Sequence, residues 1–415
     1  MTKLPYSSLT PGQQKLKFKN EANAMLLEMD KMKTSSAIEA IQNLENLLSI
    51  STIDLLNGKN SNEIAELLNV SDAYGIYTWN NQTQIWNKTT STTELKFIFP
   101  AKKNQTANNT ILSSKSVSSG IKIEIVDTSA NTYYDFNTNT WVSTPQIDDE
   151  IYLPTSVDAK LTIDNQQVAS FILNAKYTNG NQAPEEFGYK LILSDGYVWD
   201  NIAKKGIQNS FNSKFTYNQK NMLDFNVDSN TKIDALLNED VQLNSYQGKG
   251  NTLVKILDNF VLFGNMDVET ASNESDAFSA TQVFPDYRSR DYYTKRNIYY
   301  KKQSESEATI FNKNVKLALV SKKDGTRIAD VVQRSVIGST YNTPQVWVID
   351  SSVPTYGGYW TYNWQSSVFQ TVQYYDTELY LRFNDNTEVA MNVYFSEGFD
   401  TIETKFENFI DSFNR

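Results

Sequence analysis

The sequence predicts an α+β protein: a large antiparallel β-sheet built from repeated hairpins, with helical segments at the start, in the middle and at the end of the chain. Three observations lead to this prediction. Apolar residues follow helical spacing in the first seventy residues and again near the C-terminus. From Tyr74 onward, apolar and polar residues mostly alternate, as in strands with one buried face. One six-residue sequence pattern also occurs three times, each time where two runs of alternating apolar and polar residues meet.

Length and composition set the first limits on function. The chain has 415 residues, of which 40% are hydrophobic, so it can bury a substantial core. Its formal net charge of -10 argues against a surface that neutralises phosphates, and we therefore expect no nucleic-acid partner. No apolar run approaches the ~18 residues that a membrane-spanning helix needs.

Two residue types are absent from the sequence. Without histidine, the chain has no Ser-His-Asp triad and no imidazole metal ligand. Without cysteine, it has no thiol nucleophile, zinc ribbon or disulfide. We expect no cofactor and no metal, and any catalysis would depend on carboxylates, Lys, Tyr or hydroxyl groups.

The first seventy residues are predicted to be helical. Thr10 is placed to cap a helix whose first turn contains Pro11. Ser36 and Glu39 have the spacing of a capping box for a second helix, and a short third helix is expected from Ser61. We therefore divide the chain into a tether (1–9), a helical segment (10–70) and a β-rich domain (71–415); one interpretation divides that domain into two similar halves, 71–227 and 228–415.

The repeated phrase predicts three hairpins. It occurs as "DNQQVA" at 164–169, "DGTRIA" at 324–329 and "DNTEVA" at 385–390. Asp-Asn and Asp-Gly readily adopt the positive φ that a two-residue hairpin turn needs. We expect a hairpin in each of "KLTIDNQQVASF", "KLALVSKKDGTRIADV" and "ELYLRFNDNTEVAMNV".

Two further helices are expected. Residues 229–263 contain helix signals, with Asn251 and Thr252 leading into "LVKILDNFVLF". A helix at the C-terminus should cover one face of the sheet, because apolar residues there follow helical spacing. These are Phe399, Ile402, Phe406, Phe409, Ile410 and Phe413.

The segment "YRSRDYYTKRNIYYKK" (287–302) is basic and rich in tyrosine within an acidic chain. It is a candidate surface for anionic sugars, lipid headgroups or an acidic partner, through charge and ring stacking. The alternation in "KRNIYYKK" instead favours an edge strand protected by Lys and Arg, which is the interpretation we prefer. The candidate contact residues in this segment are Tyr287, Arg288, Arg290, Tyr292 and Tyr293.

The segment "YGGYWTYNW" (356–364) has the aromatic density of sugar-stacking platforms and of protein-interface hot spots. Alternate aromatic residues in a hairpin also commonly bury one set of rings. Both interpretations stay open, one for each face of the hairpin. The candidate contact residues are Tyr356, Tyr359, Trp360, Tyr362 and Trp364.

Carboxylates offer two weaker candidates. The segment "DFNVDSNTKIDA" (224–235) begins like a calcium loop, but Ser229 and Ala235 stand where the motif needs Gly and Glu. A strand end followed by a helix cap fits it better. The acidic pairs Asp148-Asp149 and Glu185-Glu186 lie in loop-like contexts and favour solvated charge over glycosidase chemistry.

Several phrases together resemble uncharacterised envelope lipoproteins of Bacteroidota (the Flavobacterium and Bacteroides type). They are "YGIYTWNNQTQIWNKT…TELKFIFP", "LPTSVDAKLTIDNQQVASFILNAKY" and "TEVAMNVYFSEGFDTIETKFENFIDSF". The resemblance covers most of residues 10–415 and consists of patterning. It implies an outer-membrane location through an acylated N-terminal cysteine, which this sequence lacks, so the anchor would precede Met1. It assigns no functional residue.

The leading hypothesis is therefore a non-enzymatic envelope lipoprotein that binds a partner protein, a glycan or a lipid. One alternative is a structural protein of a phage virion. A second is a carboxylate-dependent glycan hydrolase with two acidic residues facing each other beside the 356–364 aromatics. In a variant of the leading hypothesis, the sheet forms an apolar trough for lipid, which a large cavity would indicate.

Overall fold

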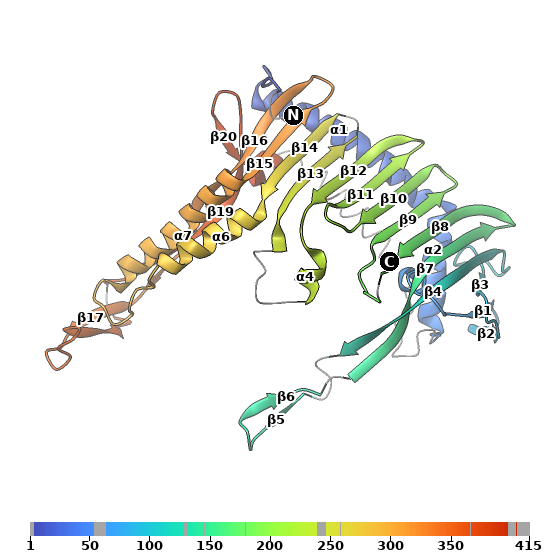
Figure 1. Ribbon diagram of the computed structural model, residues 1–415, viewed down its shortest axis with the longest axis horizontal. Helices are drawn as coiled ribbons and strands as arrows, with labels where there is room; N and C mark the ends of the chain where they lie inside the picture. The colour runs from blue at the N-terminus through green and yellow to red at the C-terminus, as the bar shows by residue number, and fades with distance from the viewer. Residues whose placement is uncertain are drawn as a thin grey trace. The chain divides into compact units, whose positions relative to one another are not determined.

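The computed structural model describes residues 4–53, 64–127, 132–144, 146–178, 180–238, 246–257, 259–365, 367–396 and 404. It confirms the predicted α+β class with a large, mostly antiparallel sheet of sixteen strands (Figure 1). The chain divides into two compact units. The N-terminal unit contains Asn20–Val227 and Val254–Asp258, and the C-terminal unit contains Met1–Lys19, Asp228–Leu253 and Asn259–Asp400.

The N-terminal helices begin close to where the sequence places them. Helix α1 (Pro11–Asp30) starts at the predicted proline, and the Thr10 and Gln13 side chains each bond the other's backbone N–H, at 3.3 and 2.9 Å. This is a capping box. Helix α2 (Ser36–Ile50) has Ser35 rather than Ser36 as its N-cap, without a capping hydrogen bond from the side chain. The short 3₁₀ helix η1 (Lys31–Thr34) and helix α3 (Ile64–Leu67) complete the segment.

The strands of the N-terminal unit follow the order β2-β1-β3-β4-β7-β8-β9-β10-β11-β12. Antiparallel neighbours predominate, and β1 and β3 are parallel. The bounds are β1 Gly75–Asn80, β2 Ile85–Thr89, β3 Leu95–Phe99, β4 Thr110–Asp127, β7 Gln146–Ile163, β8 Gln166–Lys176, β9 Glu186–Leu193, β10 Tyr197–Lys204, β11 Asn209–Tyr217 and β12 Lys220–Ser229. A separate hairpin consists of β5 (Tyr133–Asp135) and β6 (Thr140–Val142).

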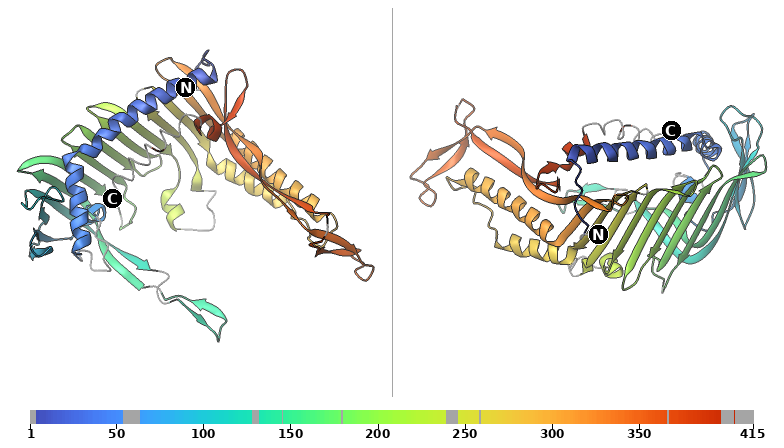
Figure 2. Two further views of the ribbon diagram at one scale, coloured as in Figure 1. Left: turned by 180° about the vertical axis from the view of Figure 1, so that it is seen from behind. Right: turned by 90° about the horizontal axis from the view of Figure 1, so that it is seen from above.

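The main core of the N-terminal unit lies where α2 covers the sheet around β1 and β3. Ala40 and Leu44 of α2 are fully buried in the same cluster as Tyr77, Phe97 and Phe99. Alternation of buried and half-buried residues along β1 and β3 places one face of each strand in this core. Figure 2 shows α2, in blue, against this end of the unit.

The strands and helices of the C-terminal unit include an extended arm. Its sheet order is β13-β14-β15-β16-β19-β20. Helix α7 packs along β16 and β19 with α6 beside it, and a separate hairpin of β17 and β18 lies at the far end of α7 (Figure 1). The bounds are α4 Ile233–Asn238, β13 Lys249–Ile256, β14 Phe260–Asp267, α6 Val268–Thr281, α7 Tyr292–Asn314, β15 Val315–Ser321, β16 Thr326–Thr343, β17 Gln345–Ile349, β18 Gly358–Tyr362, β19 Gln370–Arg382, β20 Glu388–Ala390 and α8 Met391–Ser396.

All three predicted hairpins are present, as β7–β8, β15–β16 and β19–β20. Asp164 and Asn165 have φ of 49° and 66°, as a two-residue turn requires. Gly325 and Asn386 supply positive φ in the other two turns, at 64° and 62°. The third hairpin is shorter than predicted, because helix α8 begins at Met391.

Two secondary-structure predictions are wrong. "LVKILDNFVLF" is not a helix but parts of β13 and β14, separated by a turn at Leu257, whose φ is 53°. Its apolar residues fit either period, and pairing of Val261 with Val320 of β15 selects the strand. "KRNIYYKK" lies in helix α7, because Arg296 and Ser304 are buried together against the sheet at helical spacing. The predicted C-terminal covering helix lies outside the described residues, apart from 404.

Candidate functional site

The two segments predicted as contact surfaces come together at the end of the arm. Residues 286–293 lead into α7, and residues 356–364 include strand β18. The hairpin formed by β17 and β18, which we call the distal hairpin, packs one face against the start of α7. The sequence identified both segments but not their contact.

Trp360 anchors the distal hairpin to α7. Its ring meets that of Tyr293 edge-on, with centroids 4.9 Å apart and an interplanar angle of 88°. Its indole Nε1 donates a hydrogen bond of 2.9 Å to the backbone oxygen of Ser289, and Trp347 lies opposite on β17, 5.4 Å away. This inward face is core packing, one of the two interpretations left open for the segment.

Gln345 fixes the other end of the same face. It is buried, and its side-chain oxygen accepts hydrogen bonds from the hydroxyl groups of Tyr287, at 3.0 Å, and of Tyr293. Burial raises the pKa of Tyr293, so this hydroxyl stays a neutral donor at physiological pH. Three polar groups are thereby satisfied together at the base of the hairpin.

Asp286 contacts two further predicted residues, Arg288 and Tyr356, at the edge of the distal hairpin. Its carboxylate accepts hydrogen bonds from the Arg288 guanidinium at 3.0–3.1 Å and from the Tyr356 hydroxyl at 3.0 Å. The Arg288 guanidinium also lies over the Tyr356 ring, 4.9 Å from its centroid. The hydrogen bond from Arg288 lowers the pKa of Asp286 to about 2. The basic charge of this segment is therefore partly neutralised within the arm.

Arg296 stiffens the arm behind the hairpin. It is 7% exposed and lies between the rings of Tyr300 and Tyr374, with centroids 4.7 and 4.5 Å from its guanidinium carbon. Tyr300 belongs to α7 and Tyr374 to β19, so the stacked cation joins helix to sheet. Ser304, two helical turns further on, donates a hydrogen bond of 2.7 Å to the backbone oxygen of Asp376 on β19.

The remaining rings face solvent and, with one aliphatic side chain, form what we call the distal aromatic surface: Ile349, Tyr359, Tyr362, Trp364 and Phe369. Trp364 is 78% exposed and Tyr362 58%, and their rings stack 5.6 Å apart at 13°. Tyr359 is opposite Val348 in the register, on the face away from Trp360, whereas Tyr362 is opposite Gln345 and shares the face of Trp360. Exposed large apolar side chains close together, as Tyr362 and Trp364 are, typically mark an interaction site.

Two predicted residues contribute less directly. Arg290 is exposed beside the Ser289 carbonyl that holds Trp360. Tyr292 is half-buried and contacts the rings of Phe284, Tyr287 and Tyr293. Phe284 and Gln345 were missed, because neither belongs to an aromatic or basic run that the sequence makes conspicuous.

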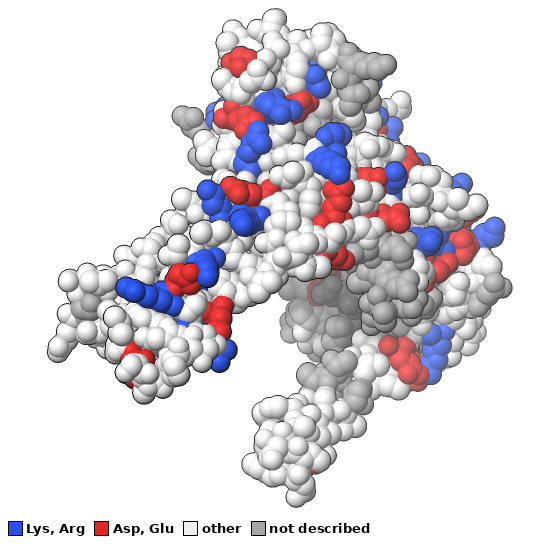
Figure 3. Space-filling view, turned by 60° about the vertical axis from the view of Figure 1, so that its left-hand side comes forward, with Lys and Arg blue, Asp and Glu red and all other residues white. Residues whose placement is uncertain are grey.

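The N-terminal unit carries a second exposed aromatic hairpin that the sequence analysis also missed. Phe136 and Trp141 of the β5–β6 hairpin are 83% and 72% exposed, and both contact the ring of Tyr134, at 5.1 and 5.4 Å. On the face shown in Figure 3, this hairpin, at the bottom of the view, is almost entirely free of charged side chains. The sequence did contain a signal for it, because "YYDFNTNTW" (133–141) has four aromatic residues in nine, against five in nine for 356–364.

The carboxylates of the predicted alternatives have ordinary structural partners. Asp224 of the calcium-like segment bonds Lys255 at 2.8 Å and Asn226 at 2.6 Å. Burial acts to raise its pKa, but these hydrogen bonds outweigh it and lower the pKa. In the described part of the chain, no three acidic groups gather as a metal site. Asp286 and Asp350 at the hairpin both have lowered pKa values, opposite to the shift of a glycosidase general acid.

An apolar pocket of about 400 Å³ lies in the N-terminal unit between α2 and strands β7 to β9. Ile38 and Ile41 of α2 face Leu161, Phe171 and Leu191 of the sheet across it. Its volume is at the small end of known ligand pockets. It offers far less room than a lipid-filled trough along the whole sheet.

Comparisons with protein-family models, with curated proteins and with solved structures found no match. Among the described residues, no helix combines the length and apolar character needed to cross a bilayer.

Proposed function

We propose that this chain is a non-enzymatic binding protein of the cell envelope, and that the distal aromatic surface contacts a partner protein. The observation that carries the proposal is the exposure of Tyr359, Tyr362 and Trp364 on a hairpin that the half-buried Trp360 and the buried Gln345 fix to α7. Tyr and Trp are the residue types most enriched at energetic hot spots of protein interfaces.

The contacts that fix the hairpin to α7 support a role for it in binding. A two-stranded hairpin is at best marginally stable by itself in water. In this arm, Trp360, Gln345 and the Asp286–Arg288–Tyr356 contacts hold it in place. Binding then has little backbone ordering to offset, which favours affinity.

A protein fits this surface better than a lipid or a glycan. Strands β17 and β18 form a sheet of only two strands, so each has an edge with unpaired backbone groups that another strand can extend. Arg288 and Asp286 at the rim add charges of both signs, which suits a mixed protein surface. The net charge of -10 disfavours approach to an anionic bilayer.

The envelope location is a proposal supported by the resemblance to Bacteroidota lipoproteins, in which a lipid anchor would hold the protein at the outer membrane. A phage virion protein would use the same surface as an assembly contact. Cell fractionation with intact mass separates the two: an acylated protein in the outer-membrane fraction supports the envelope, and unacylated protein in purified virions supports the alternative.

The binding test uses the full-length tagged protein, cross-linked and purified from its native source. We expect a stoichiometric protein partner with the native sequence, and loss of that partner in the Tyr362→Ala/Trp364→Ala variant. Ile207→Ala is the matched control, because Ile207 is 96% exposed in the other unit. Truncating two hot-spot rings should weaken binding at least about tenfold.

Three results would contradict a protein partner at this surface. One is retention of the partner by the double variant. Another is equal loss in the Ile207→Ala control. The third is recovery of only polysaccharide or lipid, released by the double variant, which would keep the surface and change the ligand class.

A further inference from the structure

A second pocket, of about 340 Å³, lies in the C-terminal unit, on the sheet where β14, β15, β16 and β19 adjoin. It shares no residue with the distal hairpin or with the distal aromatic surface. Its lining combines cationic groups with an apolar wall. The residues that matter to the argument are Phe263, Lys316, Arg327, Asp330, Arg334 and Arg382.

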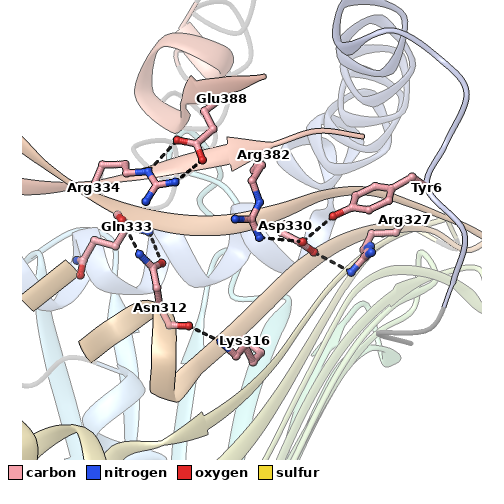
Figure 4. A network of polar contacts seen from close by, with 9 residues as sticks. All are labelled: Tyr6, Asn312, Lys316, Arg327, Asp330, Gln333, Arg334, Arg382 and Glu388. Carbon is pink, nitrogen blue, oxygen red and sulfur yellow. Dashed lines mark hydrogen bonds and ion pairs between the residues drawn. The ribbon is translucent and has the colours of Figure 1, made fainter. Parts of the chain in front are cut away.

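Strand register brings the charged residues of this pocket to one face of the sheet. Asp330 on β16 is directly opposite Arg382 on β19, and Arg382 is opposite Glu388 on β20. Arg334, four residues after Asp330, reaches Glu388 with two hydrogen bonds (Figure 4). Ala318, opposite Asp330, and Lys316, two residues before it on β15, belong to the same face.

The charges in this network do not balance. Four cations, Lys316, Arg327, Arg334 and Arg382, face three carboxylates: Asp330, Glu388 and Glu378, which is directly opposite Arg334 in the register. The local charge is therefore +1. The whole chain carries -10, so this local excess runs against the overall composition. A concentration of like charge in a concave site attracts a counter-ion.

Hydrogen-bond donors are also in excess. Asp330 accepts from Arg327 at 3.1 Å, from Arg382 at 3.4 Å and from the Tyr6 hydroxyl at 2.6 Å. A guanidinium has five N–H donors, and these contacts use one of Arg327, one of Arg382 and two of Arg334. Among the described residues, the buried Nε of Arg327 meets no acceptor. In the described part of the chain, the guanidinium donors therefore outnumber the acceptors that contact them.

The cations are held in position before any ligand arrives. The residues that precede α1 lie along Arg327, whose backbone N–H donates to Pro5 and whose carbonyl accepts from Ser7, both at 2.8 Å. The Arg327 guanidinium lies 3.8 Å from the centroid of the Tyr6 ring. At the other end, the Asn312 side chain bonds the backbone N–H and carbonyl of Gln333, both at 2.8 Å (Figure 4). Such preorganisation reduces the cost of binding.

We propose that this pocket binds a phosphate-monoester dianion. The dianion supplies negative charge and hydrogen-bond acceptors to a network with an excess of cations and donors. Guanidinium groups are the preferred partners of phosphate oxygens because they offer paired N–H donors. The volume of about 340 Å³ leaves room for a small organic group beside the phosphate, against Phe263 and Val332. A free phosphate ester and the headgroup of phosphatidic acid share this chemistry.

The test is isothermal titration calorimetry of the full-length protein at low salt and slightly alkaline pH, with glycerol 3-phosphate as the soluble probe. We expect saturable binding that weakens at least about tenfold in Arg382→Gln, since one charge-assisted contact is lost. Arg382 is chosen because its side chain is 38% exposed, and Arg334→Gln is the second variant. The matched control is Lys322→Gln, which removes one exposed charge from the β15–β16 turn.

A parallel arm measures sedimentation with vesicles of phosphatidylcholine, with and without phosphatidic acid. Binding of the soluble probe alone identifies a free phosphate ester as the ligand, and binding of phosphatidic-acid vesicles lost in Arg382→Gln identifies a lipid headgroup. The proposal is overturned if neither probe binds saturably to the folded protein of native sequence. It is equally overturned if Lys322→Gln weakens binding as much as Arg382→Gln does, because the effect would then be net charge alone.

Discussion

The distal hairpin (β17–β18) and the β5–β6 hairpin have similar composition and different support. Both are two-stranded, separate from the main sheet of their unit, and rich in exposed rings. In the distal hairpin, Trp360 and Gln345 lie on one face, and both contact Tyr293 of α7. In the β5–β6 hairpin, the described ring contacts join Tyr134, Phe136 and Trp141 only to one another. Similar aromatic densities thus give a hairpin fixed to a helix in one unit and a self-contained cluster in the other.

This difference bears on which hairpin is ready to bind. A surface on a fixed base loses little conformational entropy when a partner docks, whereas a marginal hairpin must be ordered at the same time. We therefore assign the primary contact to the distal hairpin. The two hairpins also offer paired substitutions, in which the same change is made with and without a supporting helix.

The largest expected effect is a difference in the free energy of unfolding between alanine variants of Trp360 and Trp141. Trp360→Ala should lower the free energy of unfolding of the C-terminal unit by about 3 kcal/mol, because it removes a packed ring and the Ser289 hydrogen bond. Trp141→Ala should cost less than about 1 kcal/mol, since that ring is 72% exposed. Chemical denaturation together with amide hydrogen exchange of both hairpins measures the two values. Equal costs would show that the distal hairpin is no better anchored than β5–β6.

A smaller effect is expected at Gln345. Gln345→Ala leaves the buried Tyr293 hydroxyl without its acceptor and should destabilise the distal hairpin by about 2 kcal/mol. Tyr287→Phe, which removes only the more exposed of the two hydrogen bonds, is the control and should cost about 0.5 kcal/mol. Hydrogen exchange of the β17 and β18 amides gives both numbers. A cost for Gln345→Ala no larger than for Tyr287→Phe would contradict the buried polar base.

The smallest effect concerns two aspartates, Asp286 beside the distal hairpin and Asp135 within the β5–β6 hairpin. The hydrogen bond from Arg288 lowers the pKa of Asp286 to about 2, so its contribution to stability is present above the ordinary pKa of ~3.9 and is lost as pH falls through about 2. The backbone N–H of Asn137 is the main cause that lowers the pKa of Asp135. We expect both hairpins to be insensitive to pH between about 5 and 8, as the chain has no histidine.

Salt distinguishes the two aspartates. Added salt should move the pKa of Asp286 toward its ordinary value, because a charged partner is screened, and should change that of Asp135 less. Titration of the carboxyl carbons by NMR at low and high ionic strength measures both. A larger shift at Asp135 would mean that the Asp286–Arg288 pair does not form in solution.

Local sequence signals predicted much of the fold. The start of α1 at Pro11 and the turns at Asp164-Asn165 and Gly325 follow from capping and from positive φ, which depend on neighbouring residues alone. The errors arose where two periods fit equally well. "LVKILDNFVLF" became strands because β15 supplies hydrogen-bond partners, and "KRNIYYKK" became helical because one face of α7 packs on the sheet.

The candidate site divides in the same way. Its aromatic and basic segments were conspicuous in the sequence, whereas Gln345 and Phe284 became recognisable only when the distal hairpin was seen against α7. The pocket around Asp330 gave no local signal at all. Its cations come from β15, β16 and β19, and a cross-strand register cannot be read from any one of them.

The sequence by itself determined the α+β class, the turns of the hairpins, the absence of histidine and cysteine chemistry, and which segments are rich in aromatic rings. Tertiary structure alone decided which rings are buried and which are exposed, and which charges meet. The physical reason is range. Capping, turn geometry and side-chain periodicity act over a few residues. The packing of Trp360 on α7 and the charge excess beside Asp330 depend on strands and helices that lie far apart in the chain.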